Sequence, residues 1–136
     1  MQIPRTRAAI AAIAVSLMLM QQTGIAETAS GATPLTAAEI TALLSGNTAV
    51  GAWSGTPYRQ IFTASGQTTY AAENAPLDYG RWRVNVGTDK YESEWSRPGA
   101  WSAYGISRKD ALYYWVEGDG DMQSFTIEPG LALKKK

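Results

Sequence analysis

Eight short segments that alternate apolar and polar residues follow Asn47, and a turn-forming stretch separates each segment from the next. The segments are rich in Trp, Tyr, Val, Ile and Thr, which favour β-strands, and every break contains Gly, Pro, Asn or Asp. Because the breaks are short, consecutive strands pair most simply as antiparallel hairpins. The predicted strands are Thr48–Ser54, Tyr58–Ala64, Thr68–Ala72, Tyr79–Val86, Lys90–Trp95, Trp101–Ser107, Ala111–Glu117 and Met122–Glu128.

The alternation within the segments indicates which face of each strand is buried. One face of the segment 81–86 carries Trp82, Val84 and Val86, while arginine and asparagine occupy the other. Phe125 and Ile127 alternate with polar residues in the same way. A meander of this kind either closes into a barrel or stays an open half-barrel. We therefore predict a mainly β fold, a small antiparallel up-and-down barrel or half-barrel of about eight strands with one N-terminal α-helix.

The predicted helix precedes the first strand. Thr36 and Glu39 have the spacing of a capping box, in which each side chain bonds the backbone N–H of the other residue. Leu35 and Ile40 fall at the two positions of a hydrophobic staple, and Gly46 followed by Asn47 ends the helix. A helix of this length is not stable alone, so we expect it to dock on the sheet.

The first 26 residues have the three parts of a secretory signal peptide. Arg5 and Arg7 provide a positive start, and Ala8–Met20 is an apolar run of 13 residues interrupted by Ser16. Gly24 and Ala26 then place small residues before a cleavage site. We expect cleavage near Ala26, no membrane span after cleavage, and a periplasmic or secreted product. The alternative is an anchor helix that is not cleaved.

The rest of the chain is long enough for a single domain. We expect a flexible lead-in over residues 27–34, one β-rich domain over residues 35–131 and a basic tail over residues 132–136. After residue 26 the chain has 10 basic and 12 acidic residues. This balance disfavours a nucleic-acid partner, because such binding depends on neutralising phosphates.

Cysteine and histidine are both absent from the 136 residues. Disulfides, thiolate metal sites and cysteine nucleophiles are thereby excluded, and the commonest general base is missing. The remaining catalytic hypothesis is a glycan hydrolase using Glu92 and Glu94, which lie about 6.6 Å apart on one strand face. An outer face in contact with water explains the same pair more simply. We expect no enzyme activity and no cofactor.

An acidic run near the last predicted turn raises the possibility of calcium. Glu117, Asp119 and Asp121 alternate around two glycines and offer the oxygen ligands that Ca²⁺ prefers. The run lacks the later glutamate of a twelve-residue calcium loop, so an acidic hairpin tip is the preferred interpretation.

Aromatic residues are the most informative feature for function. The chain has five Trp and seven Tyr but two Phe, a bias toward rings with one end in water or on a ligand. Arginine adds planar donors for a carboxylate or a sugar hydroxyl. The alternative is that Trp53, Trp82 and Trp115 are core plugs and that the arginines lie on the outer face. The candidate ligand-binding residues are Tyr58, Arg59, Arg81, Arg83, Trp95, Trp101 and Tyr104.

Gly51-Ala52-Trp53 stands at the first predicted strand, just after the helix. A Gly-x-Trp in this place is similar to the signature of the lipocalins and related up-and-down barrels. That resemblance implies a tryptophan closing the barrel floor with an arginine packed over it, for which Arg108 is a candidate.

A second set of motifs extends over most of the chain after residue 34. The motifs are Leu35-Thr36, Leu43-Leu44-Ser45-Gly46-Asn47-Thr48, Gly51 with Trp53, Pro57-Tyr58, Gly80-Arg81-Trp82-Arg83-Val84, Tyr91 with Trp95, Trp101 with Tyr104, and Tyr114-Trp115. With these motifs the chain resembles a family of small exported bacterial domains of unknown function, which implies the same architecture and export. Members often have a cysteine pair near the positions of Trp95 and Trp101, which this chain lacks.

Two hypotheses for function follow. The first is an exported, non-enzymatic module that binds a small amphipathic or glycan-like ligand through Trp, Tyr and Arg side chains. The alternative is a periplasmic protein-interaction or inhibitor-type module without a small-molecule pocket, whose aromatic residues around Ser96–Ala100 face an envelope protein. We expect a monomer in either case. A cavity lined by aromatic rings would favour the first hypothesis, and a filled barrel the second.

Overall fold

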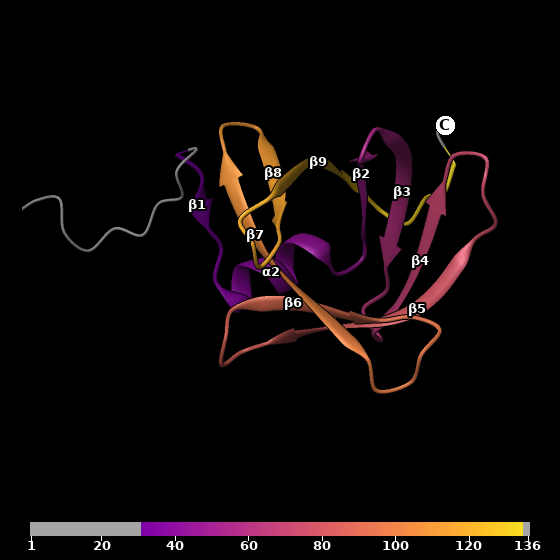
Figure 1. Ribbon diagram of the computed structural model, residues 1–136, viewed down its shortest axis with the longest axis horizontal. Helices are drawn as coiled ribbons and strands as arrows, with labels where there is room; N and C mark the ends of the chain where they lie inside the picture. Colours follow the sequence, from indigo (N-terminus) through magenta and orange to yellow (C-terminus); the bar gives the residue numbers. More distant parts are fainter. Residues whose placement is uncertain (1–30, 135–136) are drawn as a thin grey trace, which may run out of the picture.

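The computed structural model describes residues 31–134, which form a closed antiparallel β-barrel of eight strands with one further short strand and one short helix. The ring of strands is visible in Figure 1. This fold confirms the predicted mainly β class and selects the closed barrel over the half-barrel. The elements are β1 (Thr33–Pro34), α2 (Ala37–Leu44), β2 (Asn47–Trp53), β3 (Thr56–Phe62), β4 (Gln67–Ala72), β5 (Asp78–Asn85), β6 (Lys90–Glu94), β7 (Trp101–Lys109), β8 (Leu112–Val116) and β9 (Met122–Pro129).

Each strand from β2 to β9 pairs antiparallel with the next strand in the sequence, as expected for short turns. The barrel closes where β2 pairs with β9, so that Ala49 lies between Gln60 on one side and Ile127 on the other. Closure leaves no long unpaired edge in the ring formed by these strands. It also turns the alternation of each strand into an inside and an outside.

Part of the predicted lead-in has regular structure. Thr33 and Pro34 form β1, which pairs with Arg108 and Ser107 on β7. The physical reason is the length of β7, since β6 pairs with it only from Trp101 to Tyr104 and leaves the rest of that edge available. The predicted signal peptide and residues 27–30 lie outside the described residues.

The start of the predicted basic tail also contacts the barrel. Ala132 donates its backbone N–H to the Thr48 hydroxyl at 3.0 Å, and its carbonyl accepts a bond from Arg59 Nε at 2.9 Å. Residues 135–136 lie outside the described part of the chain.

The capping box of α2 is present as predicted. Thr36 Oγ1 accepts from the Glu39 backbone N–H at 3.2 Å, and Glu39 Oε1 accepts from the Thr36 backbone N–H at 2.9 Å. The helix ends at Leu44, and Gly46 then adopts a φ of +80°, a conformation that suits glycine. The Gly46 N–H bonds the Phe62 carbonyl at 2.7 Å, so the chain enters β2 directly.

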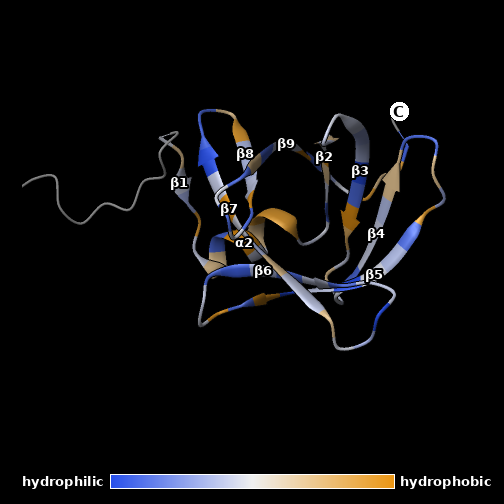
Figure 2. Cartoon of the chain, viewed as in Figure 1, coloured by the Kyte–Doolittle hydropathy of each residue, from blue (hydrophilic) through white to orange (hydrophobic). Residues whose placement is uncertain are grey.

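Helix α2 closes one end of the barrel, where it packs against β2, β5 and β6 (Figure 1). Its apolar turn, visible in Figure 2, places Ile40 and Leu44 in the core with no exposed surface. Phe62 and Trp82 meet edge to face beside them, with ring centroids 5.6 Å apart. This end of the barrel is therefore filled with side chains.

Val86 departs from the predicted apolar face of its strand. It is 82% exposed, because β5 ends at Asn85 and the chain turns back through residues 86–89.

Candidate ligand pocket

A pocket of about 320 Å³ lies at the end of the barrel remote from α2. Strand β2 starts directly after the helix and ends at Trp53, which lines the pocket, so the length of β2 separates the two. Inward-facing residues of neighbouring strands meet there because alternate residues of every strand point into a barrel. The lining residues are Trp53, Tyr58, Gln60, Tyr70, Asp78, Tyr91, Ser93, Trp95, Tyr104 and Trp115.

Tyr58 and Trp115 are the centre of the pocket floor. Both are almost fully buried, and Trp115 Nε1 donates to the Tyr58 hydroxyl at 2.8 Å. Trp115 stacks on Phe125 with ring centroids 4.4 Å apart, and Tyr58 stacks on Tyr70 at 4.9 Å. Burial raises the pKa of Tyr58 far above its ordinary value, so its hydroxyl stays neutral.

Gly51 makes this floor possible. A Cβ at this position would lie 2.7 Å from the Ser124 carbonyl oxygen and 3.2 Å from the Tyr58 hydroxyl. A side chain at Gly51 would therefore push Tyr58 away or separate β2 from β9. The glycine of the Gly-x-Trp motif thus has a packing role beside the pocket.

A second buried hydrogen-bond group lies next to the floor. Gln60 Nε2 donates to the Tyr91 hydroxyl at 3.1 Å and to Thr68 Oγ1 at 2.9 Å. Burial raises the pKa of Tyr91 to about 12, so this phenol is also neutral. These bonds hold the polar groups of Gln60 and Tyr91 in place in a pocket that is lined mostly by aromatic rings.

The rim of the pocket consists of two edge-to-face ring pairs. Trp53 meets Tyr104 at a centroid distance of 5.7 Å, and Tyr70 meets Trp95 at 6.2 Å. Trp95 folds over Gly80, where a Cβ would lie 2.8 Å from the Trp95 ring. Its indole N–H donates to Ser93 Oγ at 3.1 Å, which fixes the ring against the barrel wall.

The charge at the mouth is negative. Asp78 lines the pocket, and no lysine or arginine is among the lining residues of residues 31–134. The pKa of Tyr70 is raised by burial and then by the nearby Asp78 carboxylate. Burial and then Glu117 raise the pKa of Tyr104 in the same way. The carboxylates of Asp78 and Glu117 therefore each raise the pKa of a tyrosine on the rim.

Three of the seven candidate residues from the sequence line this pocket, namely Tyr58, Trp95 and Tyr104. Tyr58 and Tyr104 are carried by β3 and β7, and Trp95 directly follows β6. The pocket is also lined by Trp53 and Trp115, which the sequence suggested as core plugs. Trp115 belongs to the buried core as well, as does Trp82.

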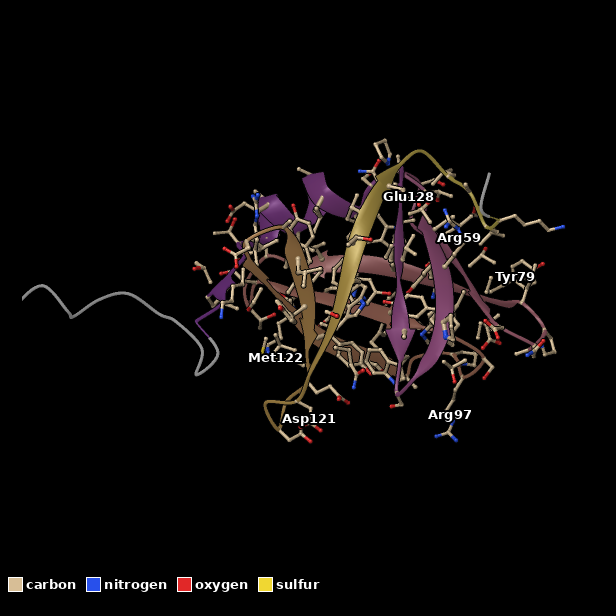
Figure 3. The ribbon with its side chains drawn as sticks, turned by 90° about the horizontal axis from the view of Figure 1, so that it is seen from above. Arg59, Tyr79, Arg97, Asp121, Met122 and Glu128 are labelled. Carbon is tan, nitrogen blue, oxygen red and sulfur yellow. The ribbon has the colours of Figure 1, made fainter. Side chains whose placement is uncertain are left out.

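The other four candidates lie on the outer surface of the barrel. Arg59 forms an ion pair with Glu128 there, as Figure 3 shows. Arg81 bonds Glu94 and Arg83 bonds Glu92, each at 2.6 Å. The Arg83 guanidinium lies 3.8 Å from the centre of the Trp101 ring. Since Arg59 follows Tyr58 and Arg81 precedes Trp82, strand alternation sends these arginines outward.

Gln60, Tyr70, Asp78, Tyr91 and Ser93 are pocket residues that the sequence analysis did not select. For three of them, the spacing of two or four residues from a selected aromatic residue was the sequence feature that could have identified them. Gln60 lies two residues after Tyr58, and Tyr91 and Ser93 lie four and two residues before Trp95, so each shares the inward face of its strand.

Glu92 and Glu94 lie outside the pocket on the outer face of β6. Hydrogen bonds from Arg83 and Arg81, respectively, are the main reason why the pKa of each carboxyl is lowered. Glu94 also accepts the Gly99 backbone N–H at 2.6 Å. A glycosidase needs one carboxyl whose pKa is raised, so this pair has the opposite electrostatics.

The carboxylates of Glu117, Asp119 and Asp121 come within 4.8 Å of one another at the tip of the β8–β9 hairpin. Asp119 accepts the Asp121 backbone N–H at 2.9 Å, and Gly120 has a φ of +96°. These contacts match the predicted hairpin tip. Nothing else in residues 31–134 points to a metal ion at this tip.

The tryptophan of the Gly-x-Trp motif is not at the end closed by the helix. Trp53 is a rim residue, and the Arg108 guanidinium lies 5.6 Å from the Tyr113 ring instead. The floor arrangement that the lipocalin resemblance implies is therefore absent at Trp53.

Comparisons with models of protein families, with curated proteins and with solved structures found no match. The resemblance to the family of small exported domains stays a prediction. Within residues 31–134, no helix has both the length and the apolar character needed to cross a membrane.

Proposed function

We propose that this protein is an exported, non-enzymatic module that binds a small ligand in the aromatic pocket. The observation that carries the proposal is the pocket itself, in which seven aromatic rings surround about 320 Å³ at the unfilled end of the barrel. Pockets for small ligands have this size range and are lined by apolar and aromatic groups with a few polar ones.

The polar groups of the pocket favour binding over catalysis. Gln60 and Trp95 already use their N–H groups on neighbouring side chains. The buried phenols of Tyr58 and Tyr91 have raised pKa values, which makes them poor bases at neutral pH. Such groups orient a ligand and do not activate a nucleophile.

The alternative is a protein-interaction module, and exposed apolar side chains near the mouth favour it. Leu77 is 42% exposed and Tyr79 is 69% exposed, and Tyr79 points away from the barrel in Figure 3. They adjoin Asp78 on the pocket rim, so a partner seated there would cover the mouth. Native mass spectrometry distinguishes the two functions.

The experiment is to express the full chain in a bacterial host, purify the product gently and measure its mass under native conditions. We expect an additional mass that denaturation releases. Tyr104→Ala, which removes a rim ring, should lose this mass, whereas Tyr79→Ala removes an exposed ring and should retain it. Circular dichroism checks that both variants fold, and Trp53→Ala replaces Tyr104→Ala if that variant does not.

Two results together would contradict the pocket function. The wild-type protein would show no additional mass, and its tryptophan fluorescence would not respond to envelope lipid and glycan fractions. In that case the exposed residues beside the mouth become the site to test with protein partners.

A further inference from the structure

The four aromatic rings of the rim line the pocket as two edge-to-face pairs. The planes of Trp53 and Tyr104 meet at 82°, and those of Tyr70 and Trp95 meet at 78°. Edge-to-face packing covers one face of one ring in each pair and leaves the remaining ring faces free of that partner, unlike a stack. The face of an aromatic ring carries partial negative charge and attracts a cation, most strongly for tryptophan.

The charges around the opening also favour a cation. The segments at this end, residues 54–55, 73–78, 95–100 and 117–121, contain Glu73, Asp78, Glu117, Asp119 and Asp121 but a single basic residue, Arg97. Figure 3 shows Asp121 and Arg97 at this end, with the Arg97 side chain extending away from the barrel. A mouth with this charge concentrates cations and repels anions.

The arginines that could hold an anionic ligand form ion pairs on the outer surface of the barrel. Arg81 and Arg83 bond Glu94 and Glu92 on the outer surface and lie over the Trp101 ring. Arg59 pairs with Glu128 on the same side of the wall. A carboxylate or phosphate inside the pocket would therefore meet Asp78 without a compensating cation from the lining residues.

We infer that the ligand is an organic cation, whose ammonium group lies among the rings of Trp53, Tyr70, Trp95 and Tyr104 with the Asp78 carboxylate as its counter-charge. This inference rests on the proposed function and names the ligand class of the same pocket. Methylated ammonium groups fit such a site best, because they are weakly hydrated and match the apolar walls.

The floor supplies one further recognition element. The Tyr58 hydroxyl accepts its bond from Trp115, and no acceptor within residues 31–134 takes the Tyr58 proton. The proton is available to an oxygen atom on the inner end of the ligand. A short ammonium alcohol carries both features, which makes choline a suitable probe.

The test is isothermal titration of the full purified chain, freed of bound ligand, with choline and with 3,3-dimethyl-1-butanol. The second compound replaces the charged nitrogen by carbon and keeps the shape. We expect choline to bind at least about tenfold more tightly, and its affinity to fall as salt increases. EDTA in the buffer keeps metal ions off the Glu117–Asp121 hairpin.

Two matched variants locate the charge. Asp78→Asn should weaken choline binding about tenfold and leave the neutral analogue unchanged, while Asp110→Asn, at an exposed position in the β7–β8 turn at the other end of the barrel, should change either affinity less than twofold. Equal affinity for both compounds, or equal effects of the two variants, would overturn the cation assignment and leave the pocket function intact. If neither choline nor tetramethylammonium nor spermidine binds, the assignment is also wrong, and the retained mass under native conditions decides separately whether the pocket holds another ligand.

Discussion

Trp115 on β8 donates its indole N–H to the hydroxyl of Tyr58 on β3 at 2.8 Å, a contact across the barrel between residues 57 positions apart. Both side chains are almost fully buried, at 3% and 4% exposure. This bond joins two strands that do not pair and places the two rings in the pocket floor. It links the stability of the barrel to the shape of the site.

Tyr58→Phe should lower the free energy of unfolding by about 1–3 kcal/mol, because it leaves the buried Trp115 N–H without an acceptor. Tyr79→Phe makes the same chemical change at a side chain that is 69% exposed, and should lie within about 0.5 kcal/mol of wild type. Urea denaturation followed by fluorescence measures both. Equal stability of the two variants would show that the bond does not contribute.

Gly51→Ala should destabilise the barrel by about 1–3 kcal/mol and weaken ligand binding, since its Cβ would lie 2.7 Å from the Ser124 carbonyl oxygen. Gly118→Ala is the matched control, because no atom lies within 4 Å of a Cβ at that position. Thermal unfolding of the two variants gives the comparison. A Gly51→Ala protein as stable as wild type would mean that β2 and Tyr58 adjust without cost.

Arg83→Ala and Arg81→Ala should leave the native mass of bound ligand unchanged, because both guanidinium groups lie outside the barrel over Trp101. Their pairs with Glu92 and Glu94 contribute to stability, so we expect both variants to melt at a lower temperature than wild type. If either variant folds but loses the ligand, that arginine contributes to ligand binding and the prediction is wrong.

Acid should destabilise the protein partly through Glu92 and Glu94. Hydrogen bonds from Arg83 and Arg81 hold the pKa of each carboxyl below its ordinary value of 4.5. A lowered folded-state pKa contributes stability above pH 4.5, and that stability is lost as the pH falls through the folded-state value. The double variant Glu92→Gln and Glu94→Gln should therefore lose less melting temperature than wild type between pH 6 and about pH 3.

Glu73→Gln controls for the loss of a carboxylate at an exposed position on the β4–β5 connection. It should follow the wild-type pH profile more closely than the double variant does. The reverse order would show that the two outer-face pairs do not set the acid sensitivity.

The amino-acid sequence by itself determined the local structure of this protein. Alternation of period two and breaks with Gly, Pro, Asn or Asp place all eight strands of the barrel within a few residues of their observed ends. The capping box between Thr36 and Glu39 could also be predicted, because its two residues are three positions apart. These features depend on neighbours in the chain, so the sequence contains them directly.

The tertiary structure decided which end of the barrel is open and which rings meet there. The pairing of β2 with β9, the docking of α2 at one end, and the contact of Trp115 with Tyr58 join residues far apart in the chain. The sequence suggested Arg81 and Arg83 as ligand-binding residues. Both lie on the outer face of the barrel, where they form ion pairs from β5 to Glu94 and Glu92 on β6. Alternation separates the two faces of a strand, but only closure of the barrel shows which face encloses the pocket and which residues share it.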